Sequence, residues 1–221
     1  MDERYNHTIP PGSPRVRPET SVDARLADAQ SVAMDEQNRL LVNLILYGLL
    51  PLWGVAGFID WCCHRATKVE STSGLKESLV HSLMGIQLGI PIVLCLLFEV
   101  NVLILFICVA MWMTHEVAAH WDVHYATPRR HISIWETHVH NYMATVPLYL
   151  LMLVVILNWE VAVKAVTFDW AGQFELELLR ERPGGNAYLP AYLSFMGVLC
   201  VFPYIEENIR CLRHARAQRH T

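Results

Sequence analysis

Apolar residues run along this chain in long segments that short polar stretches separate. Gly and Pro interrupt the segments, but a membrane helix tolerates both when its neighbours satisfy the freed backbone groups. Five segments approach the roughly 20 residues that a helix needs to cross the hydrocarbon layer. The pattern predicts an all-α integral membrane protein with about five transmembrane helices. The expected spans are 40–59, a helix that follows Ser73 and ends at Phe98, 102–125, 143–163 and 189–205.

The links between the spans set their directions. Only Glu99, Val100 and Asn101 separate the second span from the third, and so short a link forces an antiparallel helical hairpin. Ser133 and Glu136 have the spacing of a capping box, which predicts the start of the fourth helix. The segment 164–188 mixes aromatic and acidic side chains and is expected to lie at the membrane surface.

The composition agrees with a membrane protein. Apolar residues make up 53% of the chain and charged residues 17%, against about 25% charged in an ordinary soluble domain. The net charge of −4 provides no basic surface for nucleic acid. We expect a polar tail, 1–38, that is disordered at least over residues 1–20. A multi-pass domain, 39–209, and a basic C-terminal tail, 210–221, are expected to follow.

The ionisable residues of the membrane domain form pairs in which a carboxylate precedes a histidine by four positions. This spacing puts both side chains on one face of a helix. One pair occurs in each of four consecutive segments, and in the third segment a further histidine continues the spacing. The pairs are Asp60 with His64, Glu77 with His81, Glu116 with His120 and then His124, and Glu136 with His140.

The predicted topology brings these pairs to one side of the membrane. The first span ends at the face where the second begins, the hairpin turns at the opposite face, and the third span returns. Four helices are therefore expected to converge on a single interfacial site. Ionisable groups are costly within a membrane protein, and by default they indicate function. Basic residues at the same interface, such as Arg129, Arg130 and those of the C-terminal tail, predict that the site faces the cytoplasm.

Histidine and carboxylate side chains together indicate a metal centre. They suit iron, zinc, manganese or copper, and more ligands are present than one ion needs. We predict two metal ions, iron first and zinc as the alternative, with His120 and His124 among the ligands. Glu116 is either a bridging ligand or, with zinc, the catalytic base. The predicted ligands are Asp60, His64, Glu77, His81, His115, Glu116, His120, His124, Glu136 and His140.

Four other assignments are less direct. The capping box gives Glu136 a structural role as well as that of a ligand. Asp122 falls on a different helix face from Glu116 and is expected to support the site from outside. His131 and His138 lie off the four-residue pattern.

The layout resembles that of the membrane-bound, histidine-rich di-iron oxygenases, the group of fatty-acid hydroxylases and desaturases. The shared features are the His120-x-x-x-His124 pair and the eight histidines, of the eleven in the chain, that are expected at one interfacial side before the C-terminal tail. The chain departs from that group in having His138-x-His140 in place of an H-x-x-H-H box. Its many carboxylates are more similar to those of ferritin-like di-iron bundles, although the spacing here is one residue longer. The resemblance implies a di-iron centre that uses O2 on a lipid substrate.

Two short runs, FIDWCCHRAT and SGLKESLVH, also resemble a bacterial membrane family. That resemblance implies a place in the bacterial inner membrane. It implies no particular activity.

Several functions are compatible with these residues. The leading hypothesis is a di-metal oxidoreductase that acts on a hydrophobic or lipid substrate within the bilayer. A zinc-dependent membrane hydrolase would use the same residues with a glutamate as base, whereas a haem protein would need only two facing histidines. A metal transporter would need polar residues through the whole membrane depth, and the opposite halves of the spans are nearly free of charge. A purely structural membrane protein is the last alternative, so the sequence leaves open whether the chain is an enzyme.

Overall fold

Helices account for most of the residues that the computed structural model describes, 22–219. No described residue belongs to a regular β-strand, and Phe98 and Leu178 form an isolated bridge. Five helices in this part of the chain are long and apolar enough to cross a membrane. The all-α membrane architecture expected from the sequence is thereby confirmed.

The helices follow one another with few residues between them. A π-helical stretch joins α1 to α2 and another joins α7 to α8. The elements are α1 (Val22–Asn43), η1 (Leu44–Leu49), α2 (Leu50–Ala66), η2 (Val69–Ser71), α3 (Leu75–Leu97), α4 (Val102–Ala126), α5 (Ile134–Leu157), α6 (Trp159–Thr167), α7 (Tyr188–Met196), η3 (Gly197–Val201) and α8 (Phe202–Gln218).

A proline follows each π-helical stretch. Pro51 is the second residue of α2, and Pro203 is the second residue of α8. Proline lacks a backbone N–H and its ring clashes with the carbonyl four residues earlier, so a wider turn before it relieves the clash. The chain stays helical through both junctions, which gives the continuous membrane-crossing helices Ala24–Ala66 and Tyr188–Gln218.

The chain divides into two compact units, Met1–Arg39 and Leu40–Thr221. The described residues of the first unit belong to α1, and an ion pair joins Arg39 to Glu36 there. The tail expected to be disordered, residues 1–20, lies outside the described residues. The second unit contains every predicted metal ligand.

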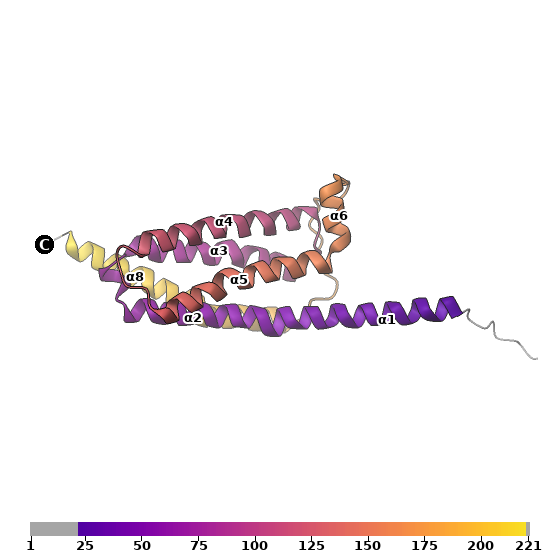
Figure 1. The fold of residues 1–221 in the computed structure, drawn as a ribbon, viewed down its shortest axis with the longest axis horizontal. Helices are drawn as coiled ribbons and strands as arrows, with labels where there is room; N and C mark the ends of the chain where they lie inside the picture. The colour runs from indigo at the N-terminus through magenta and orange to yellow at the C-terminus, as the bar shows by residue number, and fades with distance from the viewer. Residues whose placement is uncertain (1–21, 220–221) are drawn as a thin grey trace, which may run out of the picture. The chain divides into compact units, whose positions relative to one another are not determined.

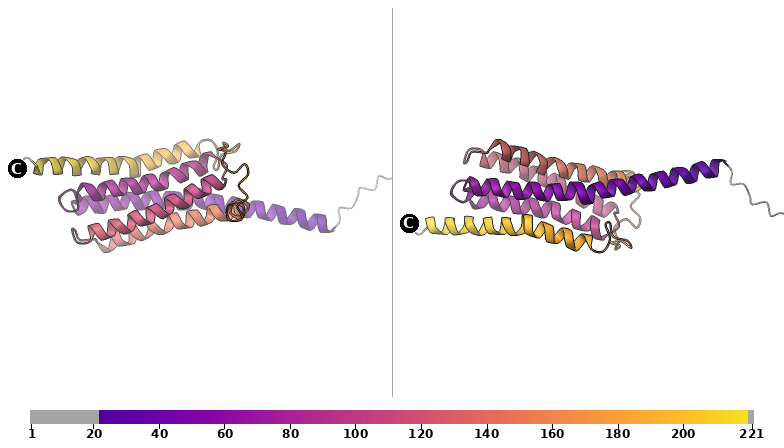
Figure 2. Two further views of the ribbon diagram at one scale, coloured as in Figure 1. Left: turned by 90° about the horizontal axis from the view of Figure 1, so that it is seen from above. Right: turned by 90° about the horizontal axis from the view of Figure 1, so that it is seen from below.

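Within the second unit, helices α2, α3, α4, α5 and α8 lie side by side as a bundle (Figures 1 and 2). α3 and α4 pack together as the predicted hairpin, α2 packs against α5, and α8 packs against α3. The loops that follow α2 and α4 lie at one end of the bundle, and the turn that follows α3 lies at the other. We call the end with the two loops the site end.

Apolar side chains fill the bundle away from the site end and also cover its outside. Leu50, Leu96 and Tyr192 pack in one cluster, and Trp53 and Leu88 pack in another. Many large apolar side chains face outward instead, as expected when the surrounding solvent is lipid. The buried residues at the site end are mostly polar or charged, so the apolar interior stops short of it.

α5 begins at Ile134, as the capping box predicts, because the Ser133 hydroxyl accepts a hydrogen bond from the backbone N–H of Glu136 at 3.1 Å. The first turns of this helix precede the expected membrane span, 143–163. The last helix also continues to Gln218, so residues 210–218 belong to α8 and form no separate tail.

In the segment 164–188, which is expected to lie at the membrane surface, α6 ends at Thr167 and a loop follows. This loop is bound to the α3–α4 turn by backbone hydrogen bonds. The N–H of Glu99 donates to Glu177 O at 2.8 Å, and the N–H of Leu179 donates to Leu97 O at 2.9 Å. The loop therefore closes the end of the bundle opposite the site.

Gly54 on α2 tests the packing of this bundle. A Cβ atom added there would lie 2.8 Å from both Met196 Sδ and Phe195 Cε1, whereas a Cβ at Gly85 on α3 would meet nothing within 4 Å. Overpacking costs about 1–3 kcal/mol, so Gly54→Leu should lower the melting temperature of the detergent-purified protein. Gly85→Leu adds the same side chain and should leave the melting temperature nearly unchanged. Equal melting temperatures for Gly54→Leu and the unmodified protein would contradict this packing.

Candidate metal centre

Three helices carry a paired acid and histidine at the site end. In each helix the two side chains are four residues apart and lie on the face that points into the bundle. Five of these six side chains are buried, and the sixth, His140, is half-buried. The structure thus brings together six of the predicted ligands. They are Asp60 and His64 on α2, Glu77 and His81 on α3, and Glu136 and His140 on α5.

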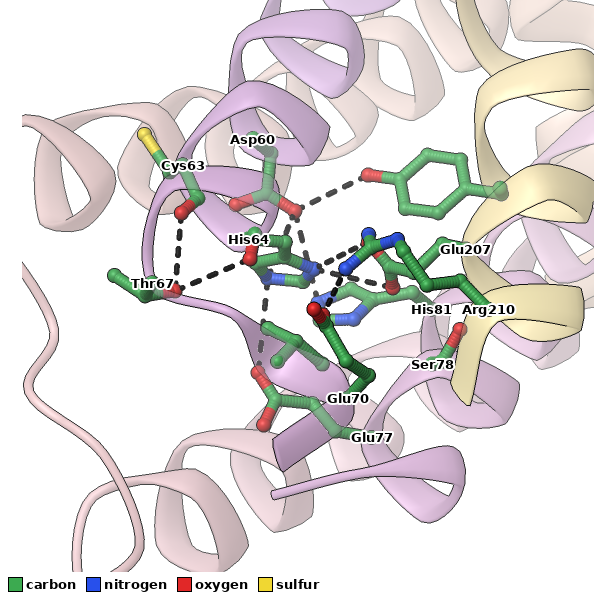
Figure 3. Close-up of polar contacts among 12 residues, drawn as sticks. Asp60, Cys63, His64, Thr67, Glu70, Glu77, Ser78, His81, Glu207 and Arg210 are labelled. Carbon is green, nitrogen blue, oxygen red and sulfur yellow. Dashed lines mark hydrogen bonds and ion pairs between the residues drawn. The ribbon is translucent and has the colours of Figure 1, made fainter. Parts of the chain in front are cut away.

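The imidazole of His64 lies at the centre of this group (Figure 3). Its Nδ1 lies 3.2 Å from Glu207 Oε2 on α8, within hydrogen-bond distance. Its Nε2 lies 3.6 Å from an oxygen of Asp60 and of Glu77, and 3.7 Å from Glu136 Oε1. These three distances are too long for hydrogen bonds. Glu207 therefore orients the ring, and the other nitrogen faces three carboxylates.

Asp60 contacts all three imidazoles of the cluster. Its Oδ1 lies 2.9 Å from His140 Nε2, and its Oδ2 lies 3.6 Å from His64 Nε2 and 3.8 Å from His81 Nε2. The hydroxyl of Tyr204 on α8 donates a hydrogen bond to Asp60 Oδ2 at 3.1 Å. Asp60 is consequently shared between the histidines and held in place from α8.

Two further helices contribute one buried carboxylate each. Asp122 on α4 lies 3.4 Å from His81 Nε2 and is 2% exposed. Glu207 on α8 contacts His64 and is fully buried. Five helices thus surround the cluster, and each supplies a carboxylate to it.

A buried arginine faces two of these acids. Arg130, in the loop between α4 and α5, donates from Nε to Glu77 Oε1 at 2.9 Å, and its Nη2 contacts Glu77 and lies 2.5 Å from Glu136 Oε1. Burial disfavours the charged guanidinium, but the hydrogen bonds and charges of Glu77 and Glu136 outweigh it and raise the pKa of Arg130 above its usual value. Among the buried residues that the structure describes, Arg130 is the one lysine or arginine.

Ion pairs at the outer edge join the helices over the cluster. Arg210 on α8 contacts Glu70 (Figure 3). Its Nε also lies 3.3 Å from Glu206 Oε1. Arg65 on α2 donates to the same Glu206 oxygen at 2.8 Å. These contacts tie α8 to α2 and to η2, and they cover the buried acids on the side of the loops.

Many polar atoms in the cluster have no hydrogen-bond partner. They include Nε2 of His64, Nδ1 of His81, Oε2 of Glu77, Oε2 of Glu136 and Oδ1 of Asp122. Nearly all buried polar groups in proteins are paired, and an unpaired one costs about 1–3 kcal/mol, more when it is charged. Most of these atoms are electron-pair donors, and such atoms could hold a metal ion.

Two groups of side chains bring possible ligand atoms close together. Within each group these atoms all lie within 4.8 Å of one another. Atoms that bind one ion at about 2.1 Å lie up to about 4.2 Å apart, so each group needs only a small contraction. No cysteine of the described chain belongs to either group, and the donors are nitrogen and oxygen. The first group is Asp60, His64, His81 and His140, and the second is Glu77, His81 and Asp122.

His120 and His124 do not join the cluster, although the sequence predicts them among its ligands. Both side chains are exposed on α4 and line a surface hollow with Trp121 and Tyr125. Each histidine is two residues from Asp122, and two residues turn a helix by about 200°. Because Asp122 faces the cluster, His120 and His124 point to nearly the opposite side.

The other two predicted ligands on α4, His115 and Glu116, also lie outside both groups of ligand atoms. His115 precedes Asp122 by seven residues, two turns, so it shares the inner face and is buried. Glu116 is half-buried, and its Oε1 has no hydrogen-bond partner. The structure gives neither residue a contact with Asp60 or His64.

Four residues of the cluster were assigned other roles or overlooked in the sequence. Glu207 follows the fifth apolar segment directly, and its position at the site end was a usable signal. Asp122 lies one heptad after His115, which would have placed it on the inner face. No local sequence pattern distinguishes Arg130 from its neighbour Arg129. No pattern marks Tyr204 as part of the cluster.

Comparisons with protein-family models, with characterised proteins and with solved structures find no match to this chain. They neither support nor contradict the resemblance to the di-iron oxygenases. The chemistry of the cluster is therefore the basis for assigning a function.

Arg130 provides a test of the electrostatics of the cluster. Arg130→Ala leaves Glu77 and Glu136 without their cation, and removal of one partner of a buried ion pair costs about 3–5 kcal/mol. Without metal, the variant should therefore melt at a much lower temperature than the unmodified protein, also without metal. Added iron or zinc should restore most of this difference in melting temperature.

The matched control is Arg129→Ala. Arg129 is exposed and stacks on the Tyr125 ring, so its removal should cost no more than about 1 kcal/mol of stability. Added metal should not change this difference between Arg129→Ala and the unmodified protein. Similar melting temperatures for the two variants would show that Arg130 does not balance buried charge.

Proposed function

We propose that this protein is a membrane oxidoreductase whose carboxylate–histidine cluster binds two metal ions, with iron as the leading candidate. The observation that carries the proposal is the group of buried carboxylates and imidazoles whose ligand atoms face one another without hydrogen-bond partners. Burial without compensation is costly for each of these groups. A cation at the centre relieves all of them together.

The balance of charge supports two ions rather than one. Five buried carboxylates surround the cluster, and Arg130 is the buried basic residue that faces them. Four negative charges would remain without compensation if every acid is ionised and every histidine is neutral, which equals the charge of two divalent cations. Arg210 reaches only the edge, since its Nη2 lies 3.9 Å from Glu207 Oε2.

The arrangement of the ligands supports iron. Ferritin-like di-iron bundles place single carboxylates on two helices and a carboxylate–histidine pair on each of the other two. Here α2, α3 and α5 each carry a pair, while α4 and α8 each carry a single acid, Asp122 and Glu207. This likeness is one of pattern, and the nitrogen and oxygen donors also suit zinc or manganese.

The residues would divide the work as follows. Asp60, His64, His81 and His140 are the ligands of one ion, and Glu77, Asp122 and Glu136 contribute to the second. Glu207 holds the Nδ1 proton of His64 and so keeps Nε2 free to bind, in the manner of carboxylate–histidine pairs at other metal sites.

Bound iron would supply the electron transfer to O2 that the oxidation of a C–H bond requires. Insertion of one oxygen atom into a C–H bond reduces the other to water, which needs two electrons and two protons from an external donor. The chain's own part is to hold the ligands apart from bulk water and to leave a side of the cluster open to substrate. His81 is the ligand that meets an apolar cavity, so a hydrophobic substrate would approach there.

The proposal predicts which histidines retain metal. His64→Ala removes the central ligand and should reduce the iron from about two ions per chain to one or none, with loss of lipid-dependent O2 consumption. His124→Ala changes an exposed histidine and should keep both. Elemental analysis of protein purified from iron-supplemented cells measures the metal, and an oxygen electrode measures consumption.

A second variant, Asp60→Asn, keeps the size of the side chain and should also lose metal if His64→Ala fails to fold. Full iron content in both His64→Ala and Asp60→Asn would refute the site. Purified protein that contains zinc in place of iron and consumes no O2 would refute the redox function and favour a hydrolase.

A further inference from the structure

An apolar cavity of about 640 Å³ leads from the metal centre into the membrane region of the bundle. One wall is α3, from Ser82 to Leu94, and the other is the continuous helix of α7, η3 and α8, from Tyr192 to Ile205. With a rise of about 1.5 Å per residue, each wall is about 18–20 Å long. The cavity is therefore a groove as long as the hydrocarbon of one leaflet, which is about 15 Å.

The groove has a polar end and an apolar end. His81, His115 and Tyr204 line it near the cluster, and His81 and Tyr204 also contact Asp60. Farther along α3 its lining is apolar as far as Leu94. A ligand with one polar end and one hydrocarbon chain matches this gradient.

Glycine keeps the floor of the groove open. Gly85 and Gly89 are one turn apart on α3 and both line the groove, and a Cβ at either position would meet nothing within 4 Å. A helix in a membrane interior usually packs a side chain or a neighbour at such positions. Two successive turns of α3 therefore leave space along the groove that no protein atom fills.

The groove opens on the outer surface of the bundle. Ile86 and Ile90 on α3 and Leu193, Val201 and Ile205 on the facing helix line it, and all five side chains are exposed. These residues lie within spans that face lipid, so the mouth of the groove meets the hydrocarbon layer. Lipid chains are the molecules concentrated there.

We infer that this groove binds one acyl chain of a membrane lipid or fatty acid, which enters sideways from the bilayer between α3 and α8. The polar end of the lipid lies at His81 and Tyr204, and the methyl end lies toward Leu94. The carbons nearest the polar end are consequently those presented to the metal centre. This inference takes its reacting site from the proposed function, but binding in the groove depends on the apolar walls and not on the metal.

Photolabelling tests the inference. The protein, in phosphatidylcholine nanodiscs, is irradiated with either of two palmitic acids, one with a diazirine near the carboxyl group and one with a diazirine near the methyl end, and mass spectrometry maps the adducts. The first probe should label around Ser82 and Ile205, and the second around Leu94 and Leu193. Excess unlabelled palmitate should suppress both.

Gly89→Leu fills the groove and should reduce labelling by about tenfold or more, because the side chain displaces two or more methylene groups worth roughly fourfold each in affinity. Leu83→Phe changes an exposed α3 residue outside the groove and should leave labelling unchanged. Both variants should retain the metal content of the unmodified protein.

Adducts spread over all outward faces, or equal labelling of Gly89→Leu and the unmodified protein, would overturn the inference. Exchanged positions for the two probes would overturn the orientation of the chain. Specific labelling of a protein that holds no metal would support lipid binding in the groove and refute the proposed function. The experiment therefore distinguishes failure of the groove from failure of the metal centre.

Discussion

The burial of five carboxylates at one end of a membrane bundle is the constraint on which the rest of this structure depends. Moving an ionised group out of water costs several kcal/mol even after the protein relaxes, and the attraction of a partner offsets this only with good geometry. Arg130 compensates part of the charge, and the rest requires either protonation of imidazoles and carboxylates or a bound cation. The cluster could therefore hold a metal ion.

The fold meets this constraint by separating two environments. Near the loops, five helices each turn an acid inward, and ion pairs such as Arg65 with Glu206 cover the group from outside. Away from the loops the same helices are apolar on both faces, and glycines on α3 leave a groove that ends at His81. The buried charges of the described residues are thus gathered at one end of the bundle.

Much of this fold and part of the site could be predicted from the sequence. The spans follow from the length of the apolar runs, and the hairpin follows from the short link before Val102. The pairs on α2 and α3 were identified because their four-residue spacing matches the helix period. On α4 the same spacing gave a wrong prediction. Glu116, His120 and His124 follow it, but the face of α4 that turns toward the cluster is the one that carries Asp122. Which face of a helix points inward depends on its neighbours, and the pattern of one helix does not contain that information.

X-ray absorption at the metal edge of the purified protein tests the central claim most directly. The account predicts a shell of nitrogen and oxygen neighbours at about 2.0–2.2 Å, with imidazole scattering and a second metal at about 3.5–4 Å. The imidazole contribution should fall in protein that carries His81→Ala. A shell that contains sulfur, or a spectrum with no bound metal above background, would contradict the account.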